Sequence, residues 1–524
     1  MEGIVDTVVL IVIAVVGAAL ARRLGFVAPL VLLVGGLGLS FVPGVPEIHI
    51  EPELVLVGIL PPLLYVAALQ TSVPAFRRAL RPILLLAIGL VVFTAVLVGL
   101  ALHWLLPEVP LSACIALGAV VAPPDAVSAT AIARRIGLPR RIVTILEGES
   151  LLNDATALVL LRVSTGALTG IAVGFWDISY QVVTKAGGGL ALGMLAALLA
   201  AWLHKKIIDS LLDDAVSLLT PFVVVIIAER LEISSVVAVV VAGLYLGHRI
   251  PYLLSPTSRL QMEAVWRLIT FLLEGVVFLL VGLQMRELVS DLETGIRTTV
   301  QATALVFGLI VVLRFVWMYP AYYLARLSPR IRSREGQASA TGPTVLGWAG
   351  MRGVVTLAAV LSLPESNAKT GDYPRDLFVF VAFAIIVLTL LVQGTTLPML
   401  ARWLGVREDT SVADALAEAS VQNQASRAAL KALEDNADGA PESVVLRLRG
   451  IAENRNNGAW ERLGSQEQET PSAAYGRLRR EMITAERHVF KIARNEGRIP
   501  EEVLTRAQRD LDLEESQLNR SDDE

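Results

Sequence analysis

Residues 147–154 read Glu147-Gly-Glu149-Ser-Leu-Leu-Asn153-Asp154, and apolar residues flank this stretch on both sides. Arg-Ile-Val-Thr-Ile-Leu precedes it and Ala-Thr-Ala-Leu-Val-Leu-Leu follows it, which places its carboxylates at membrane depth. An ionisable side chain in a bilayer-spanning helix is costly unless it faces the protein interior or a water-filled path. The stretch therefore predicts a helix that handles ions or protons.

Spacing within the stretch predicts which side chains act together. Helix positions four or seven apart share a face, so Ser150 and Glu147 align with Asp154, while Glu149 aligns with Asn153 on an adjacent face. Such a group of oxygen atoms suits a hard cation. The alternative is that these carboxylates only pair with basic residues and hold helices together, and it has most force for Glu147 and Glu149.

Composition predicts an all-α polytopic membrane protein. Hydrophobic residues make up 54% of the chain and charged residues 18%. Apolar runs near the twenty residues that cross a bilayer recur along the sequence, and we predict thirteen transmembrane helices. They lie near 4–21, 26–42, 54–70, 82–106, 111–133, 143–168, 181–203, 215–229, 234–248, 266–284, 299–325, 342–363 and 377–401.

The loops between these spans predict the orientation. Basic residues gather in alternate loops, as they do in cytoplasmic loops of membrane proteins. The loops rich in them contain Arg22 and Arg23; Arg77, Arg78 and Arg81; Arg134, Arg135, Arg140 and Arg141; Lys205 and Lys206; Arg249, Arg259 and Arg267; and Arg326, Arg330, Arg332 and Arg334. We therefore expect the N-terminus outside, the C-terminus in the cytoplasm, and the loop at Glu51 on the opposite side from the loop at Arg330.

Composition changes after Leu404, which divides the chain into a transmembrane domain, 1–404, and a tail, 405–524. The tail is polar and net acidic, so we expect it to be soluble and cytoplasmic. Alanine-rich and leucine-spaced patterns predict helices near 412–436, 472–496 and 501–518. A regulatory domain and a partly disordered appendage are both compatible with this pattern.

Two spans carry helix-breaking residues. The fifth contains Pro123 and Pro124 followed by Asp125, and prolines remove backbone donors and unwind a helix. The twelfth contains Gly350 and Gly353 within a glycine-rich run. The two breaks are seven spans apart, so the two broken helices cross the membrane in opposite directions. This arrangement predicts inverted-topology repeats, with the two broken helices crossing at a binding site in the membrane midplane. Kinked spans without function are common, so each break alone is weak evidence.

Five motifs together resemble the sodium/proton exchangers of the NhaP/NHE type, the largely electroneutral branch of the monovalent cation/proton antiporters. They are Leu60-Pro-Pro-Leu-Leu, Ala122-Pro-Pro-Asp-Ala-Val, the stretch 147–154, Phe278-Leu-Leu-Val-Gly-Leu and Gly350-Met-Arg-Gly-Val-Val. The resemblance covers nearly all of 1–404, looks closest to bacterial members with a cytoplasmic tail, and implies a homodimer in the plasma (inner) membrane. The resemblance does not extend to the tail and does not indicate a partner for it.

The resemblance also implies roles for single residues. Asp154 matches the carboxylate that alternately holds cation and proton, and Asn153 matches its neutral neighbour. Ser150 and Asp125 match positions near the ion. Glu149 and Arg352 match a buried acid and base that organise the core.

Arg352 cannot shed its charge, so it requires compensation at membrane depth. Glu149 is the first candidate partner and Glu274 the second. Three further basic residues in the spans, Arg162, Lys185 and Arg314, are expected to pair or to extend toward helix ends.

The sequence departs from the family pattern at two positions. Pro124 stands where many members have a threonine, and Val66-Ala-Ala occupies the region of the third span that often carries an acid. Carbonyl groups freed by Pro123 and Pro124, or water, are the candidate replacements for the missing oxygen ligands.

These features predict a secondary transporter that exchanges Na⁺ or Li⁺ for H⁺ by alternating access, one for one, with no cofactor and no nucleic-acid partner. Potassium/proton exchange is the alternative, because sequence spacing does not set ligand distances. A cation channel fits less well, since paired broken helices are typical of carriers. An enzyme is not expected: the chain has no His-Glu-x-x-His motif, and its five histidines are scattered.

Overall fold

The computed structural model divides the chain into two compact units, Met1–Arg407 and Glu408–Glu524. It describes residues 2–24, 27–43, 53–168, 175–290, 292, 294–327, 340–364, 373–406, 411–461, 470–496 and 498–523. Every regular element in these ranges is a helix, and they contain no strand. The all-α prediction is therefore confirmed. Glu51 and Arg330, chosen above to compare the sides of two loops, lie outside the described ranges.

Helices occupy all thirteen predicted ranges of the first unit. They are α1 Glu2–Leu24, α2 Ala28–Ser40, η1 Leu54–Ile59, α3 Leu60–Gln70, α4 Val73–Leu84, η2 Leu85–Leu90, α5 Val91–Leu105, α6 Leu111–Val121, α7 Ala126–Arg135, α8 Arg140–Leu168, α9 Phe175–Lys206, α10 Ser210–Arg230, α11 Ser235–Leu253, α12 Pro256–Leu283, α13 Met285–Ser290, α14 Ile296–Ala325, α16 Thr341–Trp348, α17 Val354–Leu361, α18 Arg375–Leu388, η3 Thr389–Gln393 and α19 Gly394–Trp403. Among the described residues, eight helical segments are long and apolar enough to cross a membrane, and four shorter apolar helices accompany them. The count of thirteen crossings stays a prediction.

The fourth span differs from its predicted start at residue 82. One continuous helical segment runs from Val73 to Leu105, so Arg77, Arg78 and Arg81 lie in a helix and not in a loop. The Ser72 side chain caps its start by accepting from the Ala75 N–H. Pro82 lies inside, and the wider π-turn η2 follows it, which keeps the helix continuous past the proline.

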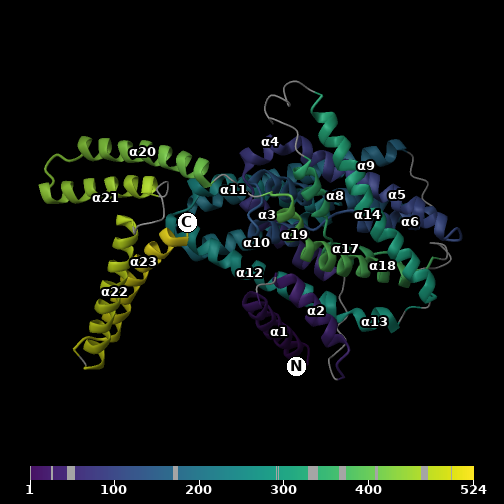
Figure 1. Ribbon diagram of the computed structural model, residues 1–524, viewed down its shortest axis with the longest axis horizontal. Coiled ribbons are helices and arrows are strands. Elements are labelled where there is room, and N and C mark those ends of the chain that lie inside the picture. The colour runs from purple at the N-terminus through teal and green to yellow at the C-terminus, as the bar shows by residue number, and fades with distance from the viewer. Residues whose placement is uncertain are drawn as a thin grey trace. The chain divides into compact units, whose positions relative to one another are not determined.

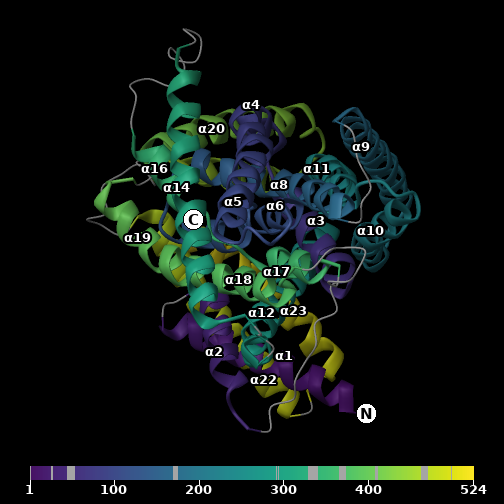
Figure 2. The same ribbon diagram turned by 90° about the vertical axis from the view of Figure 1, so that its right-hand side faces the viewer.

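The site is placed by the central helices of this unit. Helix α6 packs against α5, α8, α17 and α18, and Figure 2 shows α5, α6 and α8 together beside α17 and α18. At the edge, α2 and α12 approach closely at two glycines. A Cβ on Gly282 would lie 2.7 Å from the Leu37 nitrogen, so only glycine permits this approach.

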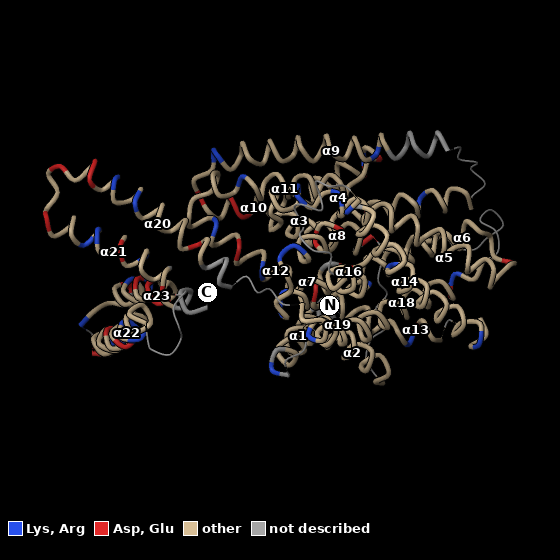
Figure 3. Tube along the Cα trace, turned by 45° about the horizontal axis from the view of Figure 1, so that its top comes forward, with Lys and Arg blue, Asp and Glu red and all other residues tan. Residues whose placement is uncertain are grey.

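The described residues of the second unit form four helices. They are α20 Ser411–Asp435, α21 Glu442–Glu461, α22 Pro471–Asn495 and α23 Glu501–Asp523, and they form two hairpins, α20 with α21 and α22 with α23 (Figure 1). Helix α21 was not predicted, because its apolar residues alternate with charged ones without a clear helical period. Lys, Arg, Asp and Glu recur along these helices, whereas most of the first unit consists of other residues (Figure 3).

Candidate ion-binding site

The two predicted breaks are present, and they contact one another. Helix α6 ends at Val121 and α7 begins at Ala126, while α16 ends at Trp348 and α17 begins at Val354. The Asp125 N–H donates to the Met351 carbonyl across the two breaks, at 2.6 Å. A Cβ on Gly353 would lie 2.6 Å from Asp125 Cγ, so this approach requires glycine.

Asp125 is the N-cap of the half-helix α7. Its carboxylate accepts from the N–H groups of Val127 at 3.2 Å and Ser128 at 3.1 Å, and from the Ser128 hydroxyl at 2.8 Å. These donors and the positive end of the helix favour the ionised carboxylate. The carboxyl group of Asp125 is therefore held in place at the crossing by the first turn of α7.

The next polar group comes from α8. Asn153 Nδ2 donates to the Pro124 carbonyl at 2.9 Å, and the Ser150 hydroxyl reaches the same oxygen at 3.4 Å. The freed carbonyl that the sequence suggested as an ion ligand thus holds α8 to the first break. Asn153 Oδ1 is buried and has no hydrogen-bond partner in the described chain, so one acceptor remains open.

Asp154 lies on the same helix and is 5% exposed. Within the described ranges, no hydrogen bond or ion pair reaches its carboxyl group, and Asp125 lies within electrostatic range. An unpaired buried carboxylate is costly unless a proton or a cation neutralises it. The geometry at this residue is therefore that of a site which holds one of these two at a time.

Glu149 pairs with Arg314 of α14, not with Arg352, and the expected pairing is wrong. Arg314 Nη1 lies 2.6 Å from Glu149 Oε1 and Nη2 lies 2.8 Å from Oε2, with both side chains almost fully buried. Arg314 Nε also donates to the Leu346 carbonyl at the end of α16. Glu149 therefore binds Arg314 directly and acts on Arg352 only through longer-range electrostatics.

Arg352 is compensated by backbone carbonyls at the two breaks. Its guanidinium donates to the carbonyls of Val121 at 2.9 Å, Ala122 at 3.2 Å and Gly350. The first two are orphan carbonyls at the end of α6, the negative end of a helix dipole, which attracts a cation. The Arg352 N–H donates to the Thr389 hydroxyl of η3.

The other two carboxylates, Glu147 and Glu274, do not pair with Arg352 in the described chain. Glu147 pairs with Arg134 at the end of α7, at 2.6 Å. Glu274 of α12 is half-buried, has no ion pair within the described ranges, and lies within electrostatic range of Asp125. It is therefore not the second partner expected for Arg352.

The predicted ligand cluster on α8 is thus divided, because Glu147 pairs with Arg134 and Glu149 pairs with Arg314. Ser150, Asn153 and Asp154 remain near the crossing. No group of three or more His, Cys, Asp or Glu side chains in the described residues could hold a metal ion. A cation at this site would have to be bound by few carboxylates, supplemented by amide, hydroxyl and carbonyl oxygens.

Residues 10–403 match the family described as "Sodium/hydrogen exchanger, transmembrane". The chain belongs to this family. An uncharacterised Na⁺/H⁺ exchanger of Mycobacterium tuberculosis is 34% identical over 98% of the chain and 96% of its own length. A "Sodium, potassium, lithium and rubidium/H(+) antiporter" of Bacillus pumilus is 29% identical over 84% and 67%. The protein is accordingly a multi-pass membrane cation/proton exchanger.

A solved structure shares the fold of the exchanger. It is the sodium proton antiporter MjNhaP1 from Methanocaldococcus jannaschii, with a TM-score of 0.60 over 77% of this chain and 99% of that one, at 18% identity. The all-helical antiporter fold inferred from the sequence is therefore confirmed.

Reasoning from the sequence missed two contributors to the site. Arg314 was expected to pair or to reach a helix end, but nothing in its surroundings along the chain indicates Glu149 as the partner. Thr389 lies in an apolar run without any motif. Only the presence of a buried arginine in a span could have suggested that an acid on another helix faces it.

Proposed function

We propose that this exchanger moves Na⁺ or Li⁺ against H⁺ by alternating access, with Asp154 as the one group that carries either ion. The proposal rests on one observation. Asp154 is buried and has no partner in the described chain, whereas the polar side chains near it are already bonded to other groups. Glu149 is bound by Arg314, Asp125 caps α7, and Asn153 is bound to Pro124. Asn153 and Ser150 supply neutral oxygens next to a bound cation.

The charges around the crossing support a stoichiometry of one to one. Glu149 and Arg314 cancel, and Asp125 and Arg352 lie on the two contacting breaks with opposite charge. Asp154 then requires one positive charge, a proton or a monovalent cation. Because Asn153 does not ionise, the pair carries no second proton.

Potassium is the second candidate substrate. The relative from Bacillus pumilus has sodium, potassium, lithium and rubidium in its name. A site with few carboxylates and several neutral oxygens distinguishes sodium from potassium by the distances between its ligands, which set the size of the ion that fits.

The proposal includes the membrane orientation and the oligomeric state of the exchanger. The basic loops favour an N-terminus outside and a cytoplasmic second unit, and the likeness to NhaP-type exchangers favours a homodimer in the plasma membrane. The second unit would then be a cytoplasmic helical tail that regulates transport. A reporter fused after Leu404 should be cytoplasmic, and an external signal there would contradict the orientation.

The proposed function is tested in proteoliposomes that contain the purified protein. Proton movement is followed after identical gradients of Na⁺, Li⁺, K⁺ and Rb⁺ are applied side by side. The proposal predicts exchange with Na⁺ and Li⁺, and no exchange with either ion would overturn it. Exchange with K⁺ at equal rate would establish the broader substrate range.

The same vesicles test electroneutrality. A membrane potential acts only on net charge moved, at about 2.3 kcal/mol per elementary charge per 100 mV. Clamping the potential at opposite signs should leave the reversal point of exchange unchanged. A shift would require a second proton carrier, and Glu274 is the first suspect, because Glu147 and Glu149 are engaged in ion pairs. Glu274→Gln would then abolish the shift.

A further inference from the structure

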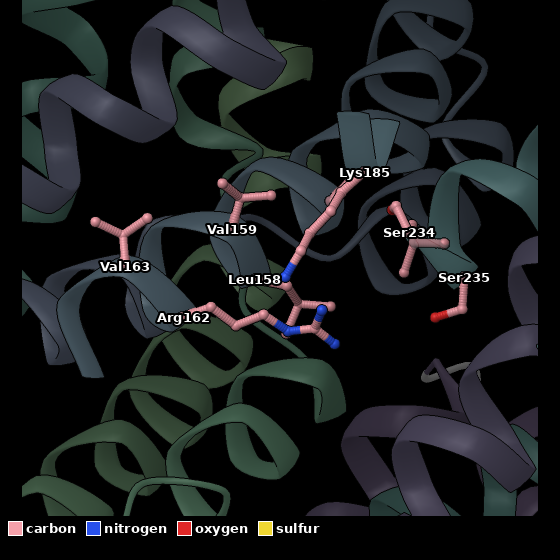
Figure 4. A pocket seen from close by; sticks show the side chains of 9 residues that line it. Leu158, Val159, Arg162, Val163, Lys185, Ser234 and Ser235 are labelled. Carbon is pink, nitrogen blue, oxygen red and sulfur yellow. The ribbon is translucent and has the colours of Figure 1, made fainter. Parts of the chain in front are cut away.

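A crevice between α8, α9 and α11 contains two basic side chains that the transport mechanism does not use. Its empty space, which includes volume open to the outside, is about 510 Å³. Its lining includes Arg162 of α8, Lys185 of α9, and Ser234 and Ser235 at the start of α11. Figure 4 shows the nitrogen-bearing ends of Arg162 and Lys185 converging from their two helices. Neither side chain has an acidic partner in the described residues.

Arg162 and Lys185 differ from the two buried arginines near the crossing, Arg314 and Arg352. Arg314 is neutralised by Glu149, and Arg352 is satisfied by carbonyls at the breaks. Charged side chains in spans are otherwise costly and normally paired. Two cations that converge without a counterion therefore leave room for an anion.

The start of α11 adds donors to the same crevice. Ser234 caps the helix, and its N–H donates to the Lys185 carbonyl, which fixes α11 against α9. The N–H groups of Ser235 and Val236 have no acceptor in the described chain, as is typical of a helix N-terminus. They carry the positive end of the helix dipole into a site that already holds two cations. The Ser235 hydroxyl is engaged by Glu229 and is not counted among the donors.

The depth of the crevice matches lipid headgroups. Arg162 is six residues before the end of α8, about 9 Å at 1.5 Å per residue. The Lys185 carbonyl accepts from the Ser234 N–H, and Ser234 precedes the first residue of α11, so Lys185 lies level with the start of that helix. All three therefore lie at one end of the helix bundle. The rest of the lining is mostly apolar, including Leu158, Val159 and Val163, and suits an acyl chain.

We propose that this crevice binds the phosphate of an anionic phospholipid, held by Arg162, Lys185 and the first N–H groups of α11, with an acyl chain against α8. A zwitterionic lipid would place a cationic headgroup beside the two bases, so a net anionic lipid is selected. Arg162 lies two helical turns beyond Asp154 on α8, and the lining of the crevice extends back to Ala155.

Native mass spectrometry of the intact, delipidated protein tests this site. Phosphatidylglycerol should bind at least about tenfold more tightly than phosphatidylcholine. R162Q/K185Q should weaken phosphatidylglycerol binding roughly 30-fold, the equivalent of two basic residues at about 1 kcal/mol each. K205Q/K206Q, which removes two exposed lysines at the other end of α9, should bind like the wild type. Equal affinity of R162Q/K185Q and wild type would overturn the proposal.

Two further arms identify the occupant. The charge-conserving R162K/K185R should retain phosphatidylglycerol binding, and its loss to the level of R162Q/K185Q would overturn the electrostatic assignment. Millimolar inorganic phosphate should not displace the lipid, because it lacks the acyl chain that contacts α8. Displacement would assign the crevice to a free anion and overturn the lipid proposal.

Discussion

Glu149 and Arg314 form a bidentate ion pair between α8 and α14, with oxygen–nitrogen distances of 2.6 and 2.8 Å and almost no exposed surface. The pair fixes the helix that carries Asp154 to the helix behind the second break. Because Arg314 also donates to the end of α16, it joins three elements around the crossing.

Removing one partner of this pair should destabilise the protein strongly. Glu149→Gln strands the buried Arg314 charge, and breaking a buried pair costs about 3–5 kcal/mol. We expect a clearly lower thermal midpoint in detergent. Glu147→Gln is the matched control on the same helix, since its pair with Arg134 is largely exposed on the arginine side and such pairs contribute about 1 kcal/mol or less. Equal midpoints for the two variants would contradict the structural role of Glu149.

Arg352→Ala should reduce the yield of folded protein because it leaves the carbonyls of Val121, Ala122 and Gly350 without their donor. Arg352→Lys should recover only part of the yield, since an ammonium cannot reproduce the planar fork of donors. Fluorescence-detected size exclusion measures the yield. Arg402→Ala, which alters an exposed residue of α19, serves as the control and should behave like wild type. Full yield from Arg352→Ala would argue that water replaces the guanidinium.

Gly353→Ala should disturb the crossing, because the added Cβ would meet three atoms of Asp125 at 2.6–2.8 Å. The two breaks would have to separate, so we expect exchange to fall by at least about tenfold while insertion is retained. Gly342→Ala lies before the same break and meets nothing within 4 Å. It should transport normally. Both are measured as sodium-driven proton flux in proteoliposomes, and equal flux from the two would refute a close crossing.

The sequence predicted the helices and both breaks because hydropathy and proline are local signals. It placed Asp125 at the start of α7 for the same reason. The partner of Glu149 could not be predicted, since residue spacing sets the face of α8 but not which helix packs on that face. The α4 helix and α21 were missed because charged residues interrupt their apolar pattern, and in α4 the Ser72 cap and the π-turn after Pro82 hold the helix.

The α22–α23 hairpin should loosen in acid. Arg479 binds Glu514 at 2.6 and 2.7 Å and holds the pKa of that carboxyl below its usual range. Because the pKa is lowered on folding, the stabilisation is complete above about pH 4.3, the ordinary value for Glu, and is lost as pH falls through the lowered one. Hydrogen exchange of α23 in the intact protein should therefore accelerate below that pH.

Two variants separate this pair from its neighbours. Arg479→Gln should remove most of the acid dependence of α23. Arg498→Gln breaks only an exposed pair with Glu496 and should leave the dependence unchanged. An unaltered pH profile in Arg479→Gln would show that other carboxylates govern the hairpin.

Asp154 is proposed to be the group that alternates between cation and proton, and exchange by purified Asp154→Asn protein in proteoliposomes tests this role. The variant keeps the volume of the side chain, so we expect normal insertion and a normal elution profile. We expect loss of both sodium uptake and proton release, because among the described residues of α8 the other two carboxylates, Glu147 and Glu149, are engaged in ion pairs. Retention of sodium-driven proton flux at the wild-type rate would contradict it.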